Sequence, residues 1–597
     1  MSNVASFDLF EDEFSFGGHA SATTTSNADA LTQFAPLFDQ PDTDVFSNRA
    51  NAPSASTSTA AATVAAAAPV LASVATIGTY IANSSPSSSA GHHFAAGSTV
   101  TVNLTGLAIA GELTEARAAL AAWAAVANIH FAETNGAGQI TIGDDADNVN
   151  YNAYTSTSWS SATLLASADI HITQKWYNNN GGAGGTVGVV NSYGYQTFLH
   201  ELGHALGLGH SGPYNGSATY GTDNIFTNDS WQYSVMSYFD QTKFGGASFS
   251  YISSAMQADI YGIQLLYGAS TTNNGNTVYG FNDTAGSAYN FSLGARSFTI
   301  YDGGGTDTLD CSGFTQNQMI DLNAGAFSSI GGLTNNISIA AGTTIENAVG
   351  GSGNDTFYAG TGSESLNGGE GIDTVVFNTN SASETVVTYN GIFDVLSLSG
   401  HQVDSLTSIE TIQFTDKSIA TSSVQQFNSL DYISGYDDLI KAFGTNGSAG
   451  FSHYIGYGYF EGRIQTSFNG WQYEASYDDL IKGLPHTEAA GAQHFITYGF
   501  AEGRARDTFD AYRYIASYAD LINAFGGTGS NAGAVNTEGA QHFVNYGFSE
   551  GRNRGTFNAA QYLANYADLS AAFGTNQIAA EFHYIQYGFF EGRTDHA

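Results

Sequence analysis

The chain has 597 residues, too many for a single hydrophobic core, and this length predicts three or four domains. Its 15 Lys and Arg residues stand against 53 Asp and Glu, and the formal net charge of −38 argues against nucleic acid or an anionic membrane as the main partner. The acidic residues are spread among 71 glycines, which favours calcium-binding loops over a merely solvated acidic surface, and the single cysteine, Cys311, excludes an intramolecular disulfide.

Residues 1–70 are rich in Ser, Thr, Ala, Asp and Asn and have no sustained apolar period, so we interpret them as a disordered leader or a propeptide. The first residues are acidic where a cleaved secretory signal needs basic ones, and export by such a signal is not expected. Thr, Ser and Pro interrupt the Ala- and Val-rich stretch 59–82, and no membrane span is predicted.

Residues 71–268 alternate between helical and strand-like patterns, which predicts an α+β domain. Apolar residues recur at helical spacing over 113–127, and a second helix is predicted over 196–208. Strands are predicted near 129–131, 139–142 and 168–173.

The second of these helices carries the chemistry. In His200-Glu201-Leu-Gly-His204, two imidazoles four residues apart lie on one helical face and can bind the same metal ion. Gly207 stands where the helix must stop, because a residue without Cβ readily adopts the left-handed conformation, and His210 can then return as a third ligand. The fourth position is left for a water whose pKa zinc lowers to around 7, and Glu201 can accept its proton as the general base of peptide hydrolysis.

A chance match on a surface helix is the alternative, and the fixed spacing of three His, one Glu and one Gly argues against it. The stretch SVMSY follows at the distance where a methionine turn should pass beneath a zinc site, so Met236 is predicted to form the floor of that site. With HELGHALGLGH followed by SVMSY, the chain resembles the metzincin clan and, within it, the serralysin branch of peptidase family M10.

This resemblance implies that one catalytic zinc ion is held by His200, His204 and His210, with Glu201 as the base. It also implies that Tyr238 ligates zinc at rest and swings away to stabilise the oxyanion, with simple packing as the alternative. Serralysins are broad endopeptidases, so protein substrates are expected, bound as an added strand at a sheet edge for which residues 168–173 are the candidate. His171 in that stretch is not assigned to zinc.

Residues 269–421 are rich in Gly, Asn, Asp and Thr and repeat every nine residues, which resembles the RTX nonapeptide. Regular copies occupy 350–358 and 368–376, and imperfect ones occupy 302–310 and 359–367. In such a repeat six residues form a calcium-binding turn and three form a short strand with one inward apolar side chain. The predicted calcium ligands are Asp307, Asp355, Glu364 and Asp373, and the predicted inward side chains are Phe357, Leu366 and Val375.

Several structural Ca²⁺ ions are therefore expected, in a parallel β-roll that folds only when calcium offsets carboxylate repulsion and the ordering entropy of Gly-rich turns. The resemblance also implies passage through a bacterial type I secretion apparatus and folding outside the cell. One departure is that serralysins usually finish soon after the roll with a short apolar export signal, whereas residues 422–597 follow here.

Residues 422–597 hold four longer repeats that end in Glu-Gly-Arg, at 461–463, 502–504, 550–552 and 591–593. Helical spacing predicts two short helices in each repeat, stacked on the next one. His453, His494, His542 and His583 recur in register, and shared internal hydrogen bonds are favoured over metal binding. The repeats are a candidate module for binding cell-envelope glycans, an S-layer component or a substrate protein.

The predicted fold class is multidomain, with an α+β metzincin catalytic domain over 71–268, a parallel β-roll of RTX nonapeptides over 269–421, and a mostly helical C-terminal repeat array over 422–597. The predicted function is a secreted zinc-dependent metalloendopeptidase that hydrolyses extracellular or cell-surface proteins. The alternative is a surface-binding RTX protein with a remnant protease domain, and the intact ligand set with Glu201 argues against it.

Overall fold

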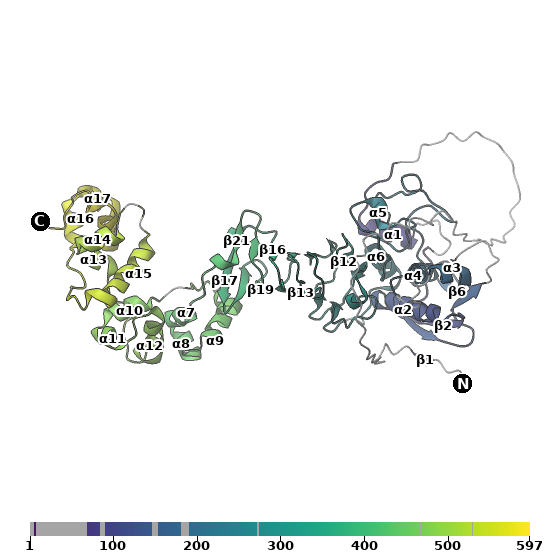
Figure 1. Ribbon diagram of the computed structural model, residues 1–597, viewed down its shortest axis with the longest axis horizontal. Coiled ribbons are helices and arrows are strands. Elements are labelled where there is room, and N and C mark those ends of the chain that lie inside the picture. Colours follow the sequence, from purple (N-terminus) through teal and green to yellow (C-terminus); the bar gives the residue numbers. More distant parts are fainter. Residues whose placement is uncertain are drawn as a thin grey trace, which may run out of the picture. The chain divides into compact units, whose positions relative to one another are not determined.

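The computed structural model describes residues 5–6, 68–83, 90–145, 153–180, 190–271, 274–465, 468–527, 529 and 531–596 (Figure 1). The chain divides into two compact units. The first contains residues up to Ser383 together with Asp404–Ser423, and the second contains Glu384–Val403 and everything from Val424 onward. The predicted leader or propeptide lies almost entirely outside the described residues. Within the described ranges, every helix is too short or too polar to cross a membrane.

A mixed sheet with strand order β1-β3-β2-β4-β6-β5 begins the first unit. Its central strands pair in parallel, and β5 pairs antiparallel with β6 at one edge. The strands are β1 (Ala5–Ser6), β2 (Thr99–Gly106), β3 (His130–Glu133), β4 (Ile140–Asp145), β5 (Ala153–Trp159) and β6 (Leu165–Thr173).

The prediction that 168–173 forms the sheet edge is wrong, because this segment belongs to β6, which lies between β4 and β5. Burial explains the difference. Ile170 and Ile172 are buried, as expected for an interior strand, whereas the edge strand β5 is made mostly of Thr and Ser and shows no apolar alternation.

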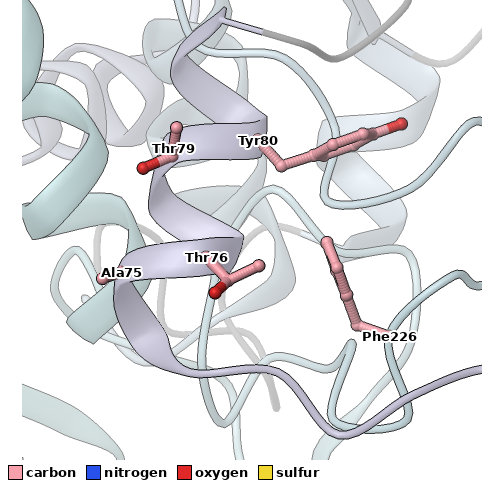
Figure 2. Close-up of a pocket in the computed structure, with 5 residues that line it drawn as sticks. All are labelled: Ala75, Thr76, Thr79, Tyr80 and Phe226. Carbon is pink, nitrogen blue, oxygen red and sulfur yellow. The ribbon is translucent and has the colours of Figure 1, made fainter.

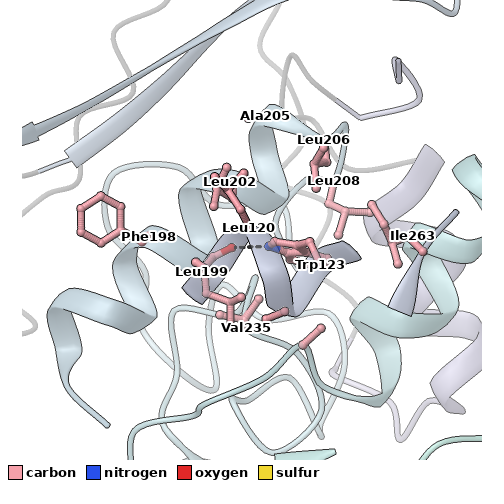
Figure 3. Close-up of a cluster of buried hydrophobic side chains, with 14 of the residues drawn as sticks. Leu120, Trp123, Phe198, Leu199, Leu202, Ala205, Leu206, Leu208, Val235 and Ile263 are labelled. Carbon is pink, nitrogen blue, oxygen red and sulfur yellow. Dashed lines mark hydrogen bonds between the residues drawn. The ribbon is translucent and has the colours of Figure 1, made fainter. Parts of the chain in front are cut away.

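Helices pack around this sheet and support the helix that carries the predicted metal ligands. The predicted helices at 113–127 and 196–208 are confirmed as α2 and α4, the latter starting and ending about three residues earlier than predicted. The indole of Trp123 on α2 donates a hydrogen bond of 3.0 Å to the carbonyl of Leu199 on α4 (Figure 3). The helices are α1 (Val74–Asn83), α2 (Ala110–Val126), α3 (Gln174–Asn180), α4 (Tyr193–Ala205), α5 (Gln241–Phe244) and α6 (Gln257–Tyr267).

The remainder of the first unit consists of short strands, many of them in parallel ladders. Successive strands alternate between two sheets, so that β13 pairs with β15 and β14 pairs with β16, two nonapeptides apart. Phe357, Leu366 and Val375 are buried at the strand centres, as predicted for inward positions. The strands are β7 (Val278–Gly280), β8 (Phe298–Ile300), β9 (Thr308–Asp310), β10 (Met319–Asp321), β11 (Phe327–Ser328), β12 (Ile337–Ile339), β13 (Asn347–Val349), β14 (Thr356–Tyr358), β15 (Ser365–Asn367), β16 (Thr374–Val376), β19 (Gln402–Thr407), β20 (Thr411–Gln413) and β21 (Ser418–Ala420).

The second unit combines the hairpin β17 (Glu384–Tyr389) and β18 (Ile392–Ser397) with a helical region. Each repeat contains three short α-helices, and the third continues into a π-helical turn, so the prediction of two helices per repeat is wrong. The helices are α7 (Ser429–Gly435), α8 (Asp437–Phe443) and α9 (Gly447–His453); α10 (Gly470–Ser476), α11 (Asp478–Gly483) and α12 (Glu488–His494); α13 (Ala511–Ala516), α14 (Ala519–Phe525) and α15 (Ala532–His542); α16 (Ala559–Asn565), α17 (Ala567–Phe573) and α18 (Gln577–His583).

A buried tyrosine explains the recurring His and Gly of these repeats. In the first repeat, His453 Nδ1 lies 2.9 Å from the hydroxyl of Tyr432, and a Cβ on Gly458 would lie 2.0 Å from the same oxygen. The same hydrogen bond recurs in the other repeats at 2.9–3.0 Å, in the pairs Tyr473–His494, Tyr514–His542 and Tyr562–His583. These histidines therefore satisfy buried hydroxyls, in line with the structural interpretation favoured from the sequence.

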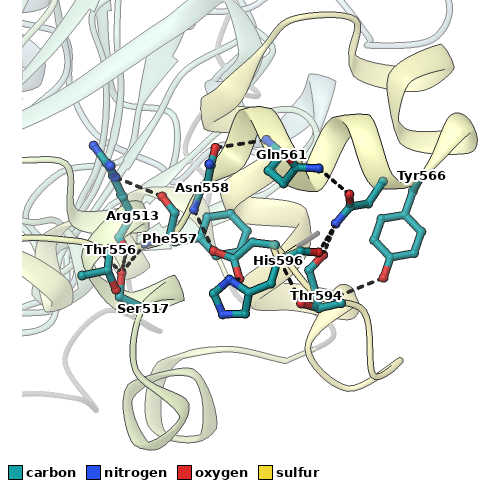
Figure 4. Close-up of polar contacts among 11 residues, drawn as sticks. Arg513, Ser517, Thr556, Phe557, Asn558, Gln561, Tyr566, Thr594 and His596 are labelled. Atoms are coloured by element: carbon teal, nitrogen blue, oxygen red, sulfur yellow. Dashed lines mark hydrogen bonds and ion pairs between the residues drawn. The ribbon is translucent and has the colours of Figure 1, made fainter.

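Neighbouring repeats are joined by hydrogen bonds to backbone groups. Between the third and fourth repeats, Ser517 Oγ accepts hydrogen bonds from the backbone N–H groups of Thr556 and Phe557, at 2.7 and 2.9 Å (Figure 4). Arg513 Nε donates to the Phe557 carbonyl at 3.1 Å. The linking segments are thereby fixed to the preceding helices.

Candidate metal centre

Three histidines converge where α4 ends. His200 and His204 project from the last turns of α4, and the chain then reverses at Gly207, whose φ of +103° lies in the left-handed region. A Cβ at Gly207 would lie 1.9 Å from the carbonyl oxygen of His92, so no other residue fits there. His210 returns with its Nε2 atom 3.0 Å from that of His204. Among the described residues, these three histidines are the one group of potential ligands whose ligand atoms all lie within 4.8 Å of one another.

The second nitrogen of each ring is occupied by a backbone carbonyl. These contacts are His200 Nδ1 to Val235 O at 2.8 Å, His204 Nδ1 to Leu208 O at 2.8 Å, and His210 Nδ1 to Tyr214 O at 3.0 Å. Each Nδ1 therefore carries the proton, which leaves the Nε2 lone pair for the shared centre. Burial lowers the pKa of His204 to about 4 and that of His210 well below its ordinary value, so both rings are neutral, as a metal ligand must be.

The segment around Met236 lies against the helix that bears these histidines. Met236 is fully buried, and a Cβ on Gly203 would lie 2.5 Å from its sulfur, which explains the glycine between Glu201 and His204. We call the segment 234–238 the methionine turn. Its Val235 carbonyl is the hydrogen-bond acceptor for His200.

Asp259 on α6 fixes the methionine turn, and sequence reasoning did not identify it. Its carboxylate accepts hydrogen bonds from Ser234 Oγ at 2.6 Å and from the backbone N–H groups of Val235 and Met256 at 2.7 and 2.8 Å. Burial raises the pKa of Asp259 to about 6. No spacing rule connects this aspartate to the histidine motif, so nothing in the local sequence indicated it.

Glu201 lies beside the edge strand of the sheet. Its side chain is buried, and Thr155 Oγ1 on β5 donates a hydrogen bond of 2.6 Å to Glu201 Oε2. Thr155 was also missed from the sequence, although β-branched Thr at alternate positions of Ala153–Trp159 was an available strand signal. The edge of the sheet and the carboxylate of the predicted base are therefore adjacent.

Tyr238 follows the methionine turn and faces the histidines. Its ring centroid lies 4.6 Å from that of His210 and 6.1 Å from that of His200. Its hydroxyl accepts a hydrogen bond of 3.4 Å from the backbone N–H of Gly216. The structure thus brings together every residue that the sequence assigned to the zinc site: His200, Glu201, His204, Gly207, His210, Met236 and Tyr238.

The predicted calcium ligands lie in separate turns of the parallel ladders. Asp373 accepts a hydrogen bond of 2.7 Å from the backbone N–H of Asp355, and Asp355 accepts two of 2.6 Å from Gln318 and Gly351. One carboxylate oxygen of Asp307, Glu364 and Asp373 is buried without a hydrogen-bond partner. Burial raises the pKa of Asp307 and Asp373 to about 6 and that of Glu364 to about 8. At neutral pH Asp307 and Asp373 are therefore mostly ionised, each with one unpaired buried oxygen, whereas Glu364 mostly retains its proton.

A separate hollow lies beside α1 (Figure 2). It is lined by Ala75, Thr76, Thr79, Tyr80 and Phe226 and contains none of the three histidines. No lining residue is acidic, basic or nucleophilic beyond threonine and tyrosine hydroxyls, and we assign no chemistry to it.

Two protein families match parts of the chain. Residues 268–453 match the family described as Peptidase M10 serralysin C terminal, and residues 114–279 match the family described as Peptidase M66. The second range contains the three histidines, and the first begins where α6 ends.

Curated metalloproteases are similar to part of the chain. Metalloprotease AprA of Pseudomonas entomophila is 41% identical over 261 residues, which are 40% of this chain and 51% of that protein. Serralysin of Proteus mirabilis is 42% identical over 260 residues, 40% of this chain and 52% of that protein. Serralysin C of Dickeya chrysanthemi is 48% identical over 189 residues, 30% of this chain and 39% of that protein. The chain thus spans about half the length of the curated relatives it matches.

A solved structure titled "Structure of myroilysin" aligns with 30% of this chain and 95% of its own at 16% identity. Its TM-score of 0.18 is too low to establish a shared fold.

Proposed function

We propose that this protein is a zinc-dependent metalloendopeptidase of the serralysin type. The observation that carries the proposal is the convergence of three imidazoles, whose Nδ1 atoms are held by carbonyls, beside the buried carboxylate of Glu201. The similarity to proteins named metalloprotease and serralysin supports it.

The donor set fits zinc, because three Nε2 atoms with an open fourth position are the usual arrangement of a catalytic zinc site. His200, His204 and His210 would hold the ion, which when bound supplies a Lewis acid and lowers the pKa of a bound water to about 7. Glu201, held by Thr155, accepts a proton and passes it to the leaving amine. Tyr238 can donate a hydrogen bond to the developing oxyanion, and the outer edge of β5 can pair with the peptide backbone.

The test is peptide hydrolysis by the full-length protein, with zinc content measured on the same samples. Wild-type protein should bind one zinc ion per chain and cleave casein. Glu201→Gln should keep the zinc and lose at least about a hundredfold in kcat, whereas His210→Ala should lose both. Glu538→Gln, in the C-terminal repeats, is the matched control. Wild-type activity in Glu201→Gln, or in chelated protein, would refute the proposal.

We also propose that residues 269–421 form a calcium-binding β-roll. Buried carboxylate oxygens without partners support this, and Ca²⁺ would complete its shell with carbonyls of the Gly-rich turns. Calcium titration of chelated protein, followed by circular dichroism, should show cooperative gain of strand structure. Asp373→Asn should raise the calcium midpoint, and Asp416→Asn, at an exposed position paired with Ser381, should not. A calcium-independent spectrum would contradict this assignment.

We further propose that residues 422–597 attach the enzyme to a cell-surface component after export through a type I secretion apparatus. Support comes from a tyrosine that recurs in every repeat and stays 40–65% exposed; these residues are Tyr457, Tyr498, Tyr546 and Tyr587. Changing all four to Ala should reduce attachment to envelope fractions while peptide hydrolysis is unchanged. Equal attachment of variant and wild type would count against this role.

A further inference from the structure

The edge strand β5 ends in an exposed aromatic residue. Trp159 is 49% exposed, and its ring stacks on that of His92 with centroids 4.7 Å apart and planes inclined by 21°. The pairing between β5 and β6 is irregular between Ser158 and Trp159. Such bulges re-aim a side chain and are frequent beside active sites. The strand thus breaks its regular geometry at the residue that presents the indole.

His92 connects this aromatic pair to the metal centre. Its carbonyl oxygen contacts Gly207, the residue that turns the chain between His204 and His210. The neighbouring His93 is fixed at the turn of the β5–β6 hairpin, where its N–H donates to Thr163 O at 3.0 Å and its carbonyl accepts from Leu165 N–H at 2.9 Å. The pair therefore lies between the edge strand and the loop that carries the third histidine.

The contact between Thr155 and Glu201 gives the distance along β5 from the predicted base to Trp159. Thr155 contacts the Glu201 carboxylate, and Trp159 stands four residues further along the same strand. At a rise of about 3.3 Å per residue, Trp159 lies about 13 Å beyond the position of the base. A peptide added at the outer edge of β5 would thus place a side chain about four residues from the scissile bond against the indole.

We propose that Trp159 and His92 form a subsite that selects a large apolar or aromatic side chain of the substrate peptide, about four residues from the cleaved bond. This inference rests on the proposed function. The half-exposed indole supplies a broad apolar face, and its stack with His92 fixes the ring before the substrate binds.

The test uses synthetic peptides that share one scissile sequence and carry Phe or Gly at the fourth position on either side of it. A short peptide that ends before those positions serves as a reference substrate. Wild-type protein should prefer Phe at one flank by about tenfold in kcat/KM. Trp159→Ala should remove that preference, and Trp159→Phe should retain part of it. Tyr358→Ala, at an exposed aromatic residue on β14, should behave as wild type.

Zinc content and short-peptide hydrolysis, both expected to be unchanged in Trp159→Ala, report that the variant is folded. The subsite is refuted if wild-type protein shows no preference at either flank, or if Trp159→Ala keeps it. If wild-type protein fails to cleave even the short peptide, the proposed function itself fails, and this outcome is distinguishable from loss of the subsite alone.

Discussion

Removal of the Asp259 side chain tests how the metal centre is held. In Asp259→Ala, three buried donors lose their acceptor: the hydroxyl of Ser234 and the backbone N–H groups of Val235 and Met256. Each buried donor left without an acceptor costs about 1–3 kcal/mol. The substitution also removes the desolvation penalty of a buried carboxylate, which offsets part of this cost, so we expect the free energy of unfolding to fall by about 3–6 kcal/mol. Because Val235 also holds His200, zinc affinity should fall about 10–100-fold.

Urea denaturation and zinc titration against a chromogenic chelator measure the two effects. Asp259→Asn keeps one acceptor oxygen and should cost less than about 2 kcal/mol. Glu112→Ala removes another fully buried carboxylate from the same unit without touching the methionine turn, so it should destabilise the protein and leave zinc affinity unchanged. If Asp259→Ala binds zinc within about twofold of wild type, the coupling through Val235 is refuted.

Two further predictions concern packing and protonation away from the metal. Burial and then the nearby Asp144 raise the pKa of Glu112 from 4.5 to about 8, so the folded state holds a proton that the unfolded state releases. Stability should therefore decline as pH rises from about 4.5 to about 8, and urea midpoints of Glu112→Gln should decline less steeply than those of wild type; parallel curves would contradict this. Gly458→Ala pushes a Cβ against the Tyr432 hydroxyl and should lower stability by about 1–3 kcal/mol. Gly456→Ala, in the same π-helical turn, meets nothing within 4 Å and should be neutral or slightly stabilising in thermal melts.

The spacing of residues along the sequence was sufficient to predict the features that depend only on local backbone geometry. Two histidines four apart on a helix share a face in any helix, and a glycine that must adopt positive φ can be read from the chain; Gly207 has that conformation. The nine-residue period likewise predicted which side chains point inward, and Phe357, Leu366 and Val375 are buried. In both cases the prediction needs no knowledge of which distant segments are neighbours.

The edge strand could not be predicted in this way, because alternation of apolar residues reports burial and not which strand has a free side. β6 shows the stronger pattern because sheet neighbours flank it on both sides, whereas the polar β5 pairs with one strand only among the described residues. The count of helices in each repeat failed for a related reason. Tyr436, in an extended conformation, separates α7 from α8, and this single-residue break leaves no mark on the apolar spacing.

The same limit applies to the metal centre. The groups that orient the three imidazoles are the backbone carbonyls of Val235, Leu208 and Tyr214. Every residue type has such a carbonyl, so the amino-acid sequence does not indicate which carbonyls accept these hydrogen bonds. The motif therefore specifies which atoms can bind a metal, and the backbone fold specifies the tautomer and the orientation of each imidazole ring. A chain that kept the HELGHALGLGH motif while displacing the methionine turn would retain three histidines and lose the hydrogen bond between His200 Nδ1 and the Val235 carbonyl, which orients that imidazole.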